Sequence, residues 1–323
     1  MICIRCNHDS TYPERRQGSQ SICPQCKGEF AFDTRLGDKF TDKAFKNTLD
    51  AVSSEGHVRW GIDHLYYEVA RRYQKRANKT KIGASIGCGT VMLVVSIISL
   101  LESMPIWPLT VFMFCLMVLV FLYQLKVSQL KREALNALWE RWKAVHGVPT
   151  GLIVPPKMPS SRKRGIEPDL KDYSFDRAVI CDKAQTVDLL LANNFHFENN
   201  CAVLSFQGYP LESFDTIRAM LKNNPHLEIF ALHDATVAGC TLAHALAEDP
   251  AWFKGQKVVD VGLRPAHCKT LKRVYQRNRS PVKETKGLTG KEAKWLSRFS
   301  VELASIRPEQ IIKRLYRAMS HQY

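Results

Sequence analysis

A long apolar stretch in the first half of the chain constrains the possible folds more than any other feature. Between Lys81 and Lys126 the only charged residue is Glu102. Residues 82–101 and 107–125 each supply about the twenty apolar or small residues that a helix needs to cross a bilayer. A charge and two prolines separate the two runs, where a helix must stop. The pattern predicts a transmembrane helical hairpin, with a buried pair of soluble helices as the alternative.

Basic residues flank this predicted hairpin at both ends, whereas the short turn between the spans has no lysine or arginine. Positively charged flanks favour the cytoplasmic side of a membrane. We therefore expect a multi-pass protein of the cytoplasmic (inner) membrane with both termini in the cytoplasm. Gly83 and Gly87 in the first span have a spacing that lets helix backbones approach closely. The hairpin is thus also a predicted contact site for a protein partner or a second copy of the chain.

Four of the ten cysteines form two Cys-x-x-Cys pairs near the amino terminus, Cys3 with Cys6 and Cys23 with Cys26. Four thiolates at this spacing can enclose one tetrahedral zinc, and they leave no coordination position open. The pattern resembles a zinc ribbon over residues 1–38, which predicts a structural zinc, with a redox role for either pair as the minor alternative. The other cysteines lie in or beside apolar runs or stand alone, which indicates core residues in a reducing compartment.

The remaining segments complete a predicted multidomain order. A helical juxtamembrane segment is predicted over 39–81, the hairpin over 82–125, a stalk helix and basic linker over 126–171, and a larger domain over 172–323. The formal net charge of +15 suits either an anionic membrane surface or nucleic acid. Charge alone therefore leaves membrane and nucleic acid open as partners.

The domain over 172–323 alternates between short apolar runs and helical periodicity. This alternation predicts an α/β fold with a mostly parallel, Rossmann-like sheet. The predicted strands are 178–181, 202–206, 228–232 and 257–261, and the predicted helices are 184–191, 213–221 and 239–247. Ligand sites in such sheets lie beyond the carboxyl ends of the strands. Asp182 follows the first strand and Asp234 the third, so both are expected on the same rim.

Several sequence blocks in this domain resemble, in order and spacing, the Toprim domain of the topoisomerase VI A-subunit type over residues 176–265. The blocks are AVICDK (178–183), VLS (203–205) with GYP (208–210), FALHDATVAG (230–239) and VGLRP (261–265). The resemblance implies a magnesium site, in which an acid after the first strand and an Asp-x-Asp after the third hold the ion against a nucleic-acid phosphate. The matching positions are Asp182, where the family has glutamate, and Asp234 with Thr236, where it has two aspartates.

These departures from the family pattern, and a hairpin where the family has its DNA-cleaving tyrosine domain, argue against a topoisomerase reaction. The leading hypothesis is a membrane-anchored Toprim-like protein that binds nucleic acid or a protein partner with weak or no catalysis. One alternative is a magnesium-dependent nuclease that uses this acidic site; another is a zinc-ribbon scaffold whose Toprim-like fold is purely structural. Asp182 and Asp234 are equally explained as helix caps. Lys183, Arg218 and Arg264 could face a phosphate at the rim or be solvated helix or loop charges.

Overall fold

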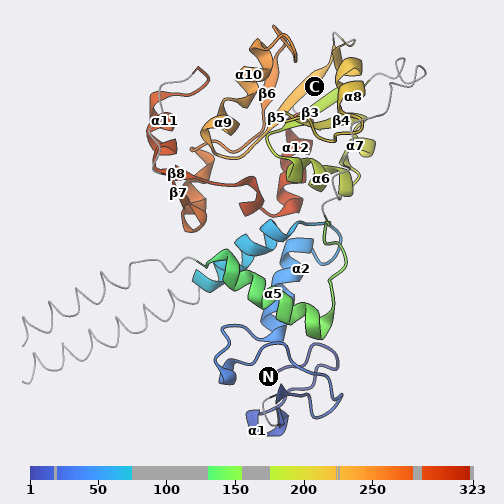
Figure 1. The fold of residues 1–323 in the computed structure, drawn as a ribbon, viewed down its shortest axis with the longest axis vertical. Helices are drawn as coiled ribbons and strands as arrows, with labels where there is room; N and C mark the ends of the chain where they lie inside the picture. Colours follow the sequence, from blue (N-terminus) through green and yellow to red (C-terminus); the bar gives the residue numbers. More distant parts are fainter. Residues whose placement is uncertain are drawn as a thin grey trace, which may run out of the picture. The chain divides into compact units, whose positions relative to one another are not determined.

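The computed structural model describes residues 1–17, 20–74, 130–154, 175–222, 224, 226–278 and 286–320. The chain divides into two compact units, residues 1–68 with 141–323 and residues 69–140. Of the second unit the structure describes 69–74 and 130–140, which are largely helical. The candidate sites described below lie in the first unit, whose helices and strands are labelled in Figure 1.

The structure corrects the expectation of a membrane protein. Within the described ranges, no helix is both long enough and apolar enough to cross a bilayer. Helix α5 (Arg132–His146) has 15 residues and α12 (Pro308–Ser320) has 13, and both carry charged side chains; a span needs about twenty apolar residues. The predicted spans, 82–101 and 107–125, lie outside the described residues. The assignments as a transmembrane protein and to the cytoplasmic membrane, with both termini in the cytoplasm, therefore have no support from the structure.

The amino-terminal module consists of short loops followed by helices. Its elements are α1 (Tyr12–Arg15), β1 (Arg16–Gln17), β2 (Gln20–Ser21), the 3-10 turn η1 (Thr34–Leu36) and α2 (Asp42–Ser53), and the end of α5 belongs to the same unit. Thr41 begins α2, because its side chain accepts a hydrogen bond from the N–H of Ala44. The aromatic core has Phe32, Phe45 and Trp142 ring centroids at 5.2, 6.3 and 4.9 Å from one another.

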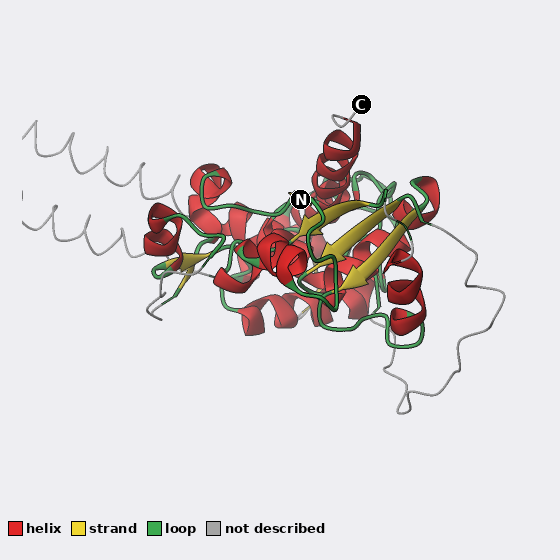
Figure 2. Ribbon diagram, turned by 90° about the horizontal axis from the view of Figure 1, so that it is seen from above, coloured by secondary structure: helices red, strands yellow, loops and turns green. Residues whose placement is uncertain are grey.

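The carboxyl-terminal domain is built on a four-stranded parallel sheet, seen from above in Figure 2. Its strands are β3 (Arg177–Cys181), β4 (Cys201–Ser205), β5 (Glu228–Leu232) and β6 (Val258–Asp260), in the order β4-β3-β5-β6. The predicted α/β fold is thus confirmed, with each strand within one or two residues of its expected position. The strand order reverses between β3 and β5, and such a switch point opens a crevice at the carboxyl ends of the strands.

Alternate residues of the strands enter two separate cores, one on each face of the sheet. Val179, Cys181 and Phe230 pack with residues of α6 (Ala184–Ala192), α7 (Phe195–Glu198) and α12. Ile180 and Ala231 pack on the opposite face with α8 (Phe214–Lys222) and α10 (Leu242–Glu248). Because both faces are covered, the interior positions of the strands are apolar in succession rather than alternating with polar ones, which is typical of parallel sheets. The helix predicted over 239–247 is instead two helices, α9 (Val237–Cys240) and α10.

The chain after β6 returns to the carboxyl end of the sheet, which we call the rim. It forms η3 (His267–Val274), β7 (Gln276–Arg277), α11 (Gly290–Leu296), β8 (Phe299–Ser300), η4 (Leu303–Ser305) and α12. Strands β7 and β8 pair antiparallel, and Val301 forms an antiparallel bridge with Ala235. This bridge brings residues 301–303 against the loop that follows β5.

Candidate functional site

The first Cys-x-x-Cys pair lies on a tight loop closed by backbone hydrogen bonds. The N–H of Cys3 donates to the carbonyl of His8 at 2.9 Å, and the N–H of Asn7 donates to the carbonyl of Cys3 at 3.0 Å. Asn7 has a φ of 58°, a left-handed conformation that asparagine tolerates better than most residues. The loop thereby turns both Cys3 and Cys6 toward the same side.

The second pair lies on a loop with the same hydrogen-bond pattern. The N–H of Cys23 donates to the carbonyl of Gly28 at 2.8 Å, and the N–H of Lys27 donates to the carbonyl of Cys23 at 3.0 Å. A Cβ atom on Gly28 would lie 3.1 Å from Cδ of Arg5 and 3.3 Å from the sulfur of Cys26. Glycine at this position therefore allows the two loops to approach closely.

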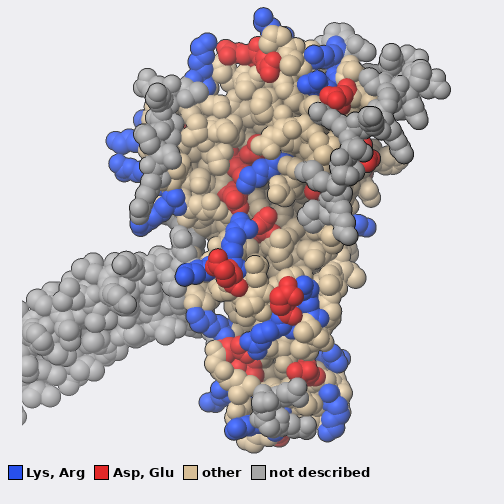
Figure 3. Space-filling model, in the orientation of Figure 1, with Lys and Arg blue, Asp and Glu red and all other residues tan. Residues whose placement is uncertain are grey.

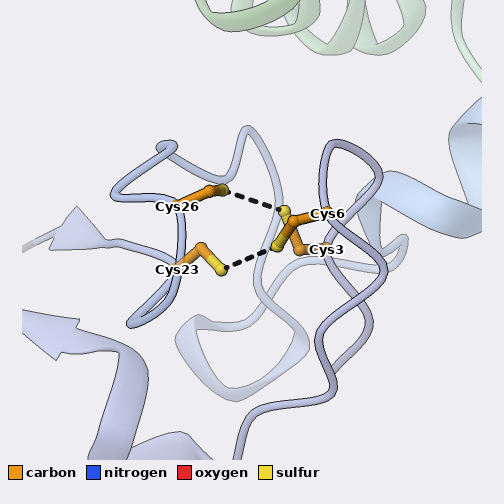
Figure 4. Close-up of side chains that lie close together, drawn as sticks. All are labelled: Cys3, Cys6, Cys23 and Cys26. Atoms are coloured by element: carbon orange, nitrogen blue, oxygen red, sulfur yellow. Dashed lines mark hydrogen bonds between the residues drawn. The ribbon is translucent and has the colours of Figure 1, made fainter.

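The four cysteine sulfurs converge, as Figure 4 shows. The Sγ atoms of Cys3 and Cys26 are 3.7 Å apart, those of Cys6 and Cys23 are 3.6 Å apart, and all four lie within 4.8 Å of one another. A tetrahedral zinc with bonds of about 2.3 Å requires sulfurs about 3.8 Å apart, so the residues fit this metal. Although burial acts to raise it, hydrogen bonds from the backbones of Cys26 and Gln25 lower the pKa of the Cys23 thiol to about 6. The predicted ligand set is brought together and could bind a metal such as zinc.

The two aspartates predicted to share the rim lie side by side at the switch point of the sheet. Asp182 follows β3, and its Oδ2 accepts a hydrogen bond of 2.9 Å from the N–H of Asp234, which lies two residues after β5. The Oδ1 of Asp234 accepts a hydrogen bond of 2.6 Å from the N–H of Leu303. Burial, followed by repulsion from Asp234, raises the pKa of Asp182 to about 6. The two side chains are therefore held by backbone N–H groups.

A lysine ammonium occupies the space beside these carboxylates. Nζ of Lys183 lies 2.6 Å from Oδ2 of Asp234 and 3.3 Å from Oε1 of Glu302. The other carboxylate oxygen of Glu302 accepts a hydrogen bond of 2.8 Å from the hydroxyl of Tyr67, which in turn accepts one of 2.7 Å from Gln276. Burial acts to lower the pKa of Lys183, but Asp234 and Glu302 raise it above its usual value. Lys183 therefore remains a cation.

Thr236, the third predicted magnesium ligand, has a structural role. Its Oγ1 accepts a hydrogen bond of 3.0 Å from the N–H of Gly239 and so caps α9. A Cβ atom on Gly239 would lie 2.3 Å from the carbonyl oxygen of Asp234, so only glycine lets the helix begin this close to the rim. Among the described residues, only the cysteine group meets the geometry of three or more convergent His, Cys, Asp or Glu ligands.

A second charge network joins the end of β5 to the end of β6. His233 is fully buried, with Nδ1 at 2.8 Å from the carbonyl oxygen of Asp234 and Nε2 at 2.9 Å from Oδ1 of Asp260. Arg264 donates to the other oxygen of Asp260 at 2.6 Å. Burial acts to raise the pKa of Asp260, but His233 and Arg264 lower it to about 2. Gly262 packs against the His233 ring, since a Cβ there would lie 2.3 Å from Cδ2.

Four exposed cations lie on α11 and on or next to the adjoining β7–β8 pair, and we call them the basic corner: Arg277, Lys291, Lys294 and Arg298. Arg277 pairs with Phe299 between β7 and β8, while Lys291 and Lys294 lie on α11. Within the described part of the chain, the structure records no salt bridge for any of the four. Figure 3 shows Lys and Arg side chains at the α11 edge of the domain, on the left, whereas acidic and basic groups mix elsewhere on that face.

Three aromatic rings from the same segments as the basic corner pack against one another. Tyr275, Trp295 and Phe299 have ring centroids 5.3 to 5.7 Å apart, and all three are partly exposed. Arg264 links the corner to the rim, since its Nη1 lies 3.6 Å from Oε1 of Glu292 on α11. This ion pair connects α11 to the charge network at the end of β6.

The sequence did not identify Glu302, Asp260 or His233 as members of the rim networks. His233 and Asp260 could have been found, because one follows β5 directly and the other ends β6, where a parallel sheet places its ligands. Glu302 carries no comparable signal, because the Val301 bridge that positions it joins segments far apart in the sequence.

Comparisons with models of known protein families, with curated proteins and with solved structures found no match. The geometry of the cysteine cluster, the rim and the basic corner is therefore what indicates function.

Proposed function

We propose that this chain is a zinc-stabilised nucleic-acid-binding protein, in which a Toprim-like domain contacts the phosphate backbone without magnesium-dependent catalysis. The observation that carries the proposal is the basic corner, where Arg277, Lys291, Lys294 and Arg298 are exposed and lack carboxylate partners among the described residues. Cations that neutralise phosphates release condensed counterions, which supplies most of the affinity in sequence-independent binding. The chain has 46 Lys and Arg and 31 Asp and Glu, and this net positive charge attracts nucleic acid over a longer range than the contacts of the basic corner do.

The partly exposed aromatic rings on the segments of the basic corner suit a single-stranded ligand. Bases stack on aromatic side chains while the backbone follows neighbouring cations, so the combination does not depend on sequence. Trp295 lies on α11 with Lys291, and Phe299 follows Arg298 directly, so the rings packed with Tyr275 come from the same segments as these cations.

The zinc would be structural. Four sulfur ligands saturate a tetrahedral ion and leave no position for water or substrate. Its contribution would be to hold the loops of Cys3 and Cys23 together, because neither loop has a helix or long strand of its own.

The resemblance to Toprim domains remains part of the proposal. The strand order, and the placement of Asp182 and Asp234 at the switch point, support it. The same adjacency of two carboxylates favours the rival function, a magnesium-dependent nuclease. Against the rival, Asp234 is paired with Lys183 and Thr236 caps a helix. The residues present do not fit a magnesium ion in this arrangement.

Binding of fluorescent single-stranded DNA and RNA to the full chain, measured over a range of salt concentrations, tests the proposal. Lys291→Gln and Lys294→Gln in one variant should weaken binding and reduce the slope of log affinity against log salt by up to about 0.7 for each lost single-strand contact. A matched control carries Lys46→Gln and Lys313→Gln, which lie on other helices and are paired with Asp50 and Glu309.

The control should bind with nearly the affinity of the unaltered chain. Equal losses in both variants would show that net charge, not the basic corner, drives binding. No binding at low salt would eliminate the nucleic-acid function and leave a protein partner as the ligand. Nicking of DNA in magnesium that Asp234→Asn abolishes would establish the nuclease instead.

A further inference from the structure

The rim buries a carboxylate that must have a counter-charge. The side chain of Asp234 is 2 % exposed. An ionised carboxylate that is removed from water is costly unless it is both paired and hydrogen-bonded. The Leu303 N–H satisfies one oxygen of Asp234, and the Lys183 ammonium at 2.6 Å faces the other. Lys183 is thus the nearest compensating charge for this buried group.

The surroundings of the ammonium resemble those of a bound cation. Two carboxylates from separate segments, Asp234 and Glu302, converge on Nζ of Lys183, and Asp182 lies against Asp234. Oxygen atoms of this kind are the ligands that magnesium and manganese prefer. The remaining oxygens of Asp234 and Glu302 already accept hydrogen bonds from Leu303 and Tyr67.

We propose that Lys183 is the resident cation of the rim, occupying the place between Asp234 and Glu302 that a divalent metal would otherwise take. The wild-type rim is therefore closed to magnesium, and loss of the ammonium alone opens a latent divalent-cation site. This inference concerns the rim of the proposed Toprim-like domain, but it depends on no nucleic-acid ligand.

The backbone explains why this lysine can reach the site. Lys183 follows Asp182 directly and stands at the N-cap of α6, where its own side chain makes no capping bond. Its extended φ and ψ of −127° and 143° leave the side chain outside the helix. The Lys183 side chain remains 41 % exposed, so the ammonium is held by charge and not by enclosure.

The test is thermal unfolding of the full, zinc-loaded chain with and without millimolar magnesium or manganese. The midpoint of the unaltered chain should not respond to either ion. Lys183→Met should unfold at a lower temperature without the ion and recover by about 5 °C or more when manganese saturates the opened site. Lys183→Arg, which keeps the charge, should remain unresponsive.

Two further variants define the site. Lys286→Met removes a lysine that is 80 % exposed and should show no manganese response. Asp234→Asn combined with Lys183→Met should lose the response, because the central ligand is gone. The inference fails if manganese raises the unfolding midpoint of the unaltered chain as much as that of Lys183→Met. It also fails if Lys183→Met folds and manganese does not raise its midpoint.

A chemical measurement covers the case in which Lys183→Met does not fold. Acetylation of Lys183 in the native chain, followed by mass spectrometry, should be slow because the ion pair keeps the amine protonated. In Asp234→Asn it should accelerate severalfold relative to Lys286, because loss of the Asp234 carboxylate removes a cause of the raised amine pKa of Lys183. An unchanged ratio would overturn the inference. Neither measurement contains nucleic acid, so a failure here is separate from a failure of the proposed binding function.

Discussion

In the amino-terminal module four cysteine sulfurs lie within 4.8 Å of one another, whereas at the rim an ammonium lies 2.6 Å from the carboxylate of Asp234. Both places concentrate groups that favour a cation. The cysteine cluster fits an ion from solution, while the rim has a cation on its own chain, Lys183. The comparison shows that convergent metal-binding residue types do not by themselves indicate a metal site, because the residue next in sequence can fill it.

The largest expected effect comes from removing the ion that the cysteine cluster fits. Cys23→Ser should abolish binding of one zinc per chain and unfold the amino-terminal loops, since metal binding in such small modules supplies folding free energy. Metal analysis and circular dichroism would measure this. Cys201→Ala, a change at a buried cysteine in β4, is the control and should retain the zinc. One zinc per chain in Cys23→Ser would show that the four cysteines do not form the zinc site.

The second prediction concerns Asp234, the carboxylate that pairs with Lys183. Asp234→Ala removes the acceptor of the Leu303 N–H and the partner of Lys183, and should lower the free energy of unfolding by about 1.5–3 kcal/mol, mainly because the buried N–H loses a charged acceptor. Urea denaturation would measure it. Asp215→Ala, whose side chain is 59 % exposed and pairs with Arg218 at 3.6 Å, should cost little. Similar values for the two variants would mean that the rim pair contributes no more than a surface pair.

The third prediction concerns pH. The folded pKa of Asp182 is raised to about 6, mainly by burial, so the folded state binds its proton more tightly than the unfolded state does. The proton on Asp182 therefore adds about 3 kcal/mol to the free energy of unfolding below about pH 4. This added stability is lost as the pH rises from 4 to 6. Asp182→Asn should remove that part of the pH dependence of the unfolding free energy. An unaltered slope between pH 4 and 6 would contradict the assignment.

The smallest effects compare one substitution in both regions. Gly239→Ala places a Cβ 2.3 Å from the Asp234 carbonyl and should cost about 1–3 kcal/mol, because backbone must shift. Gly28→Ala meets side-chain atoms at 3.1 Å and should cost less, because Arg5 can move. Gly290→Ala has open space and serves as the control. The thermal midpoint should therefore be lowest for Gly239→Ala, higher for Gly28→Ala and highest for Gly290→Ala. This order would confirm that the rim is more rigidly packed than the cysteine loops.

Much of the carboxyl-terminal fold could be predicted, because a sheet covered on both faces produces short runs whose interior residues are apolar in succession. The run 228–232 coincides with β5, and the cysteine spacing located the cluster. Local patterns of this kind depend on residues that are close in sequence. The adjacency of Asp182 and Asp234 also followed, since parallel strands end on one rim.

The role of Lys183 could not be predicted, because a lysine after a strand is equally explained by solvation. What decides it is Glu302, which reaches the rim only through the Val301–Ala235 bridge. Similarly, the hydroxyl of Thr236 suits a metal or a helix cap, and only the 3.0 Å bond from Gly239 distinguishes the two. The membrane prediction rested on hydropathy, and no described helix supports it.

The bridge between Ala235 and Val301 has a consequence for biosynthesis. The carboxylate of Asp234 acquires its Leu303 N–H only when residues 301–303 are available, although the sheet strands have all been synthesised by residue 260. A nascent chain that has not yet reached Leu303 therefore presents a sheet whose central acid is incompletely satisfied. The rim is consequently completed late in synthesis, shortly before α12 (Pro308–Ser320) fills the core on one face of the same sheet.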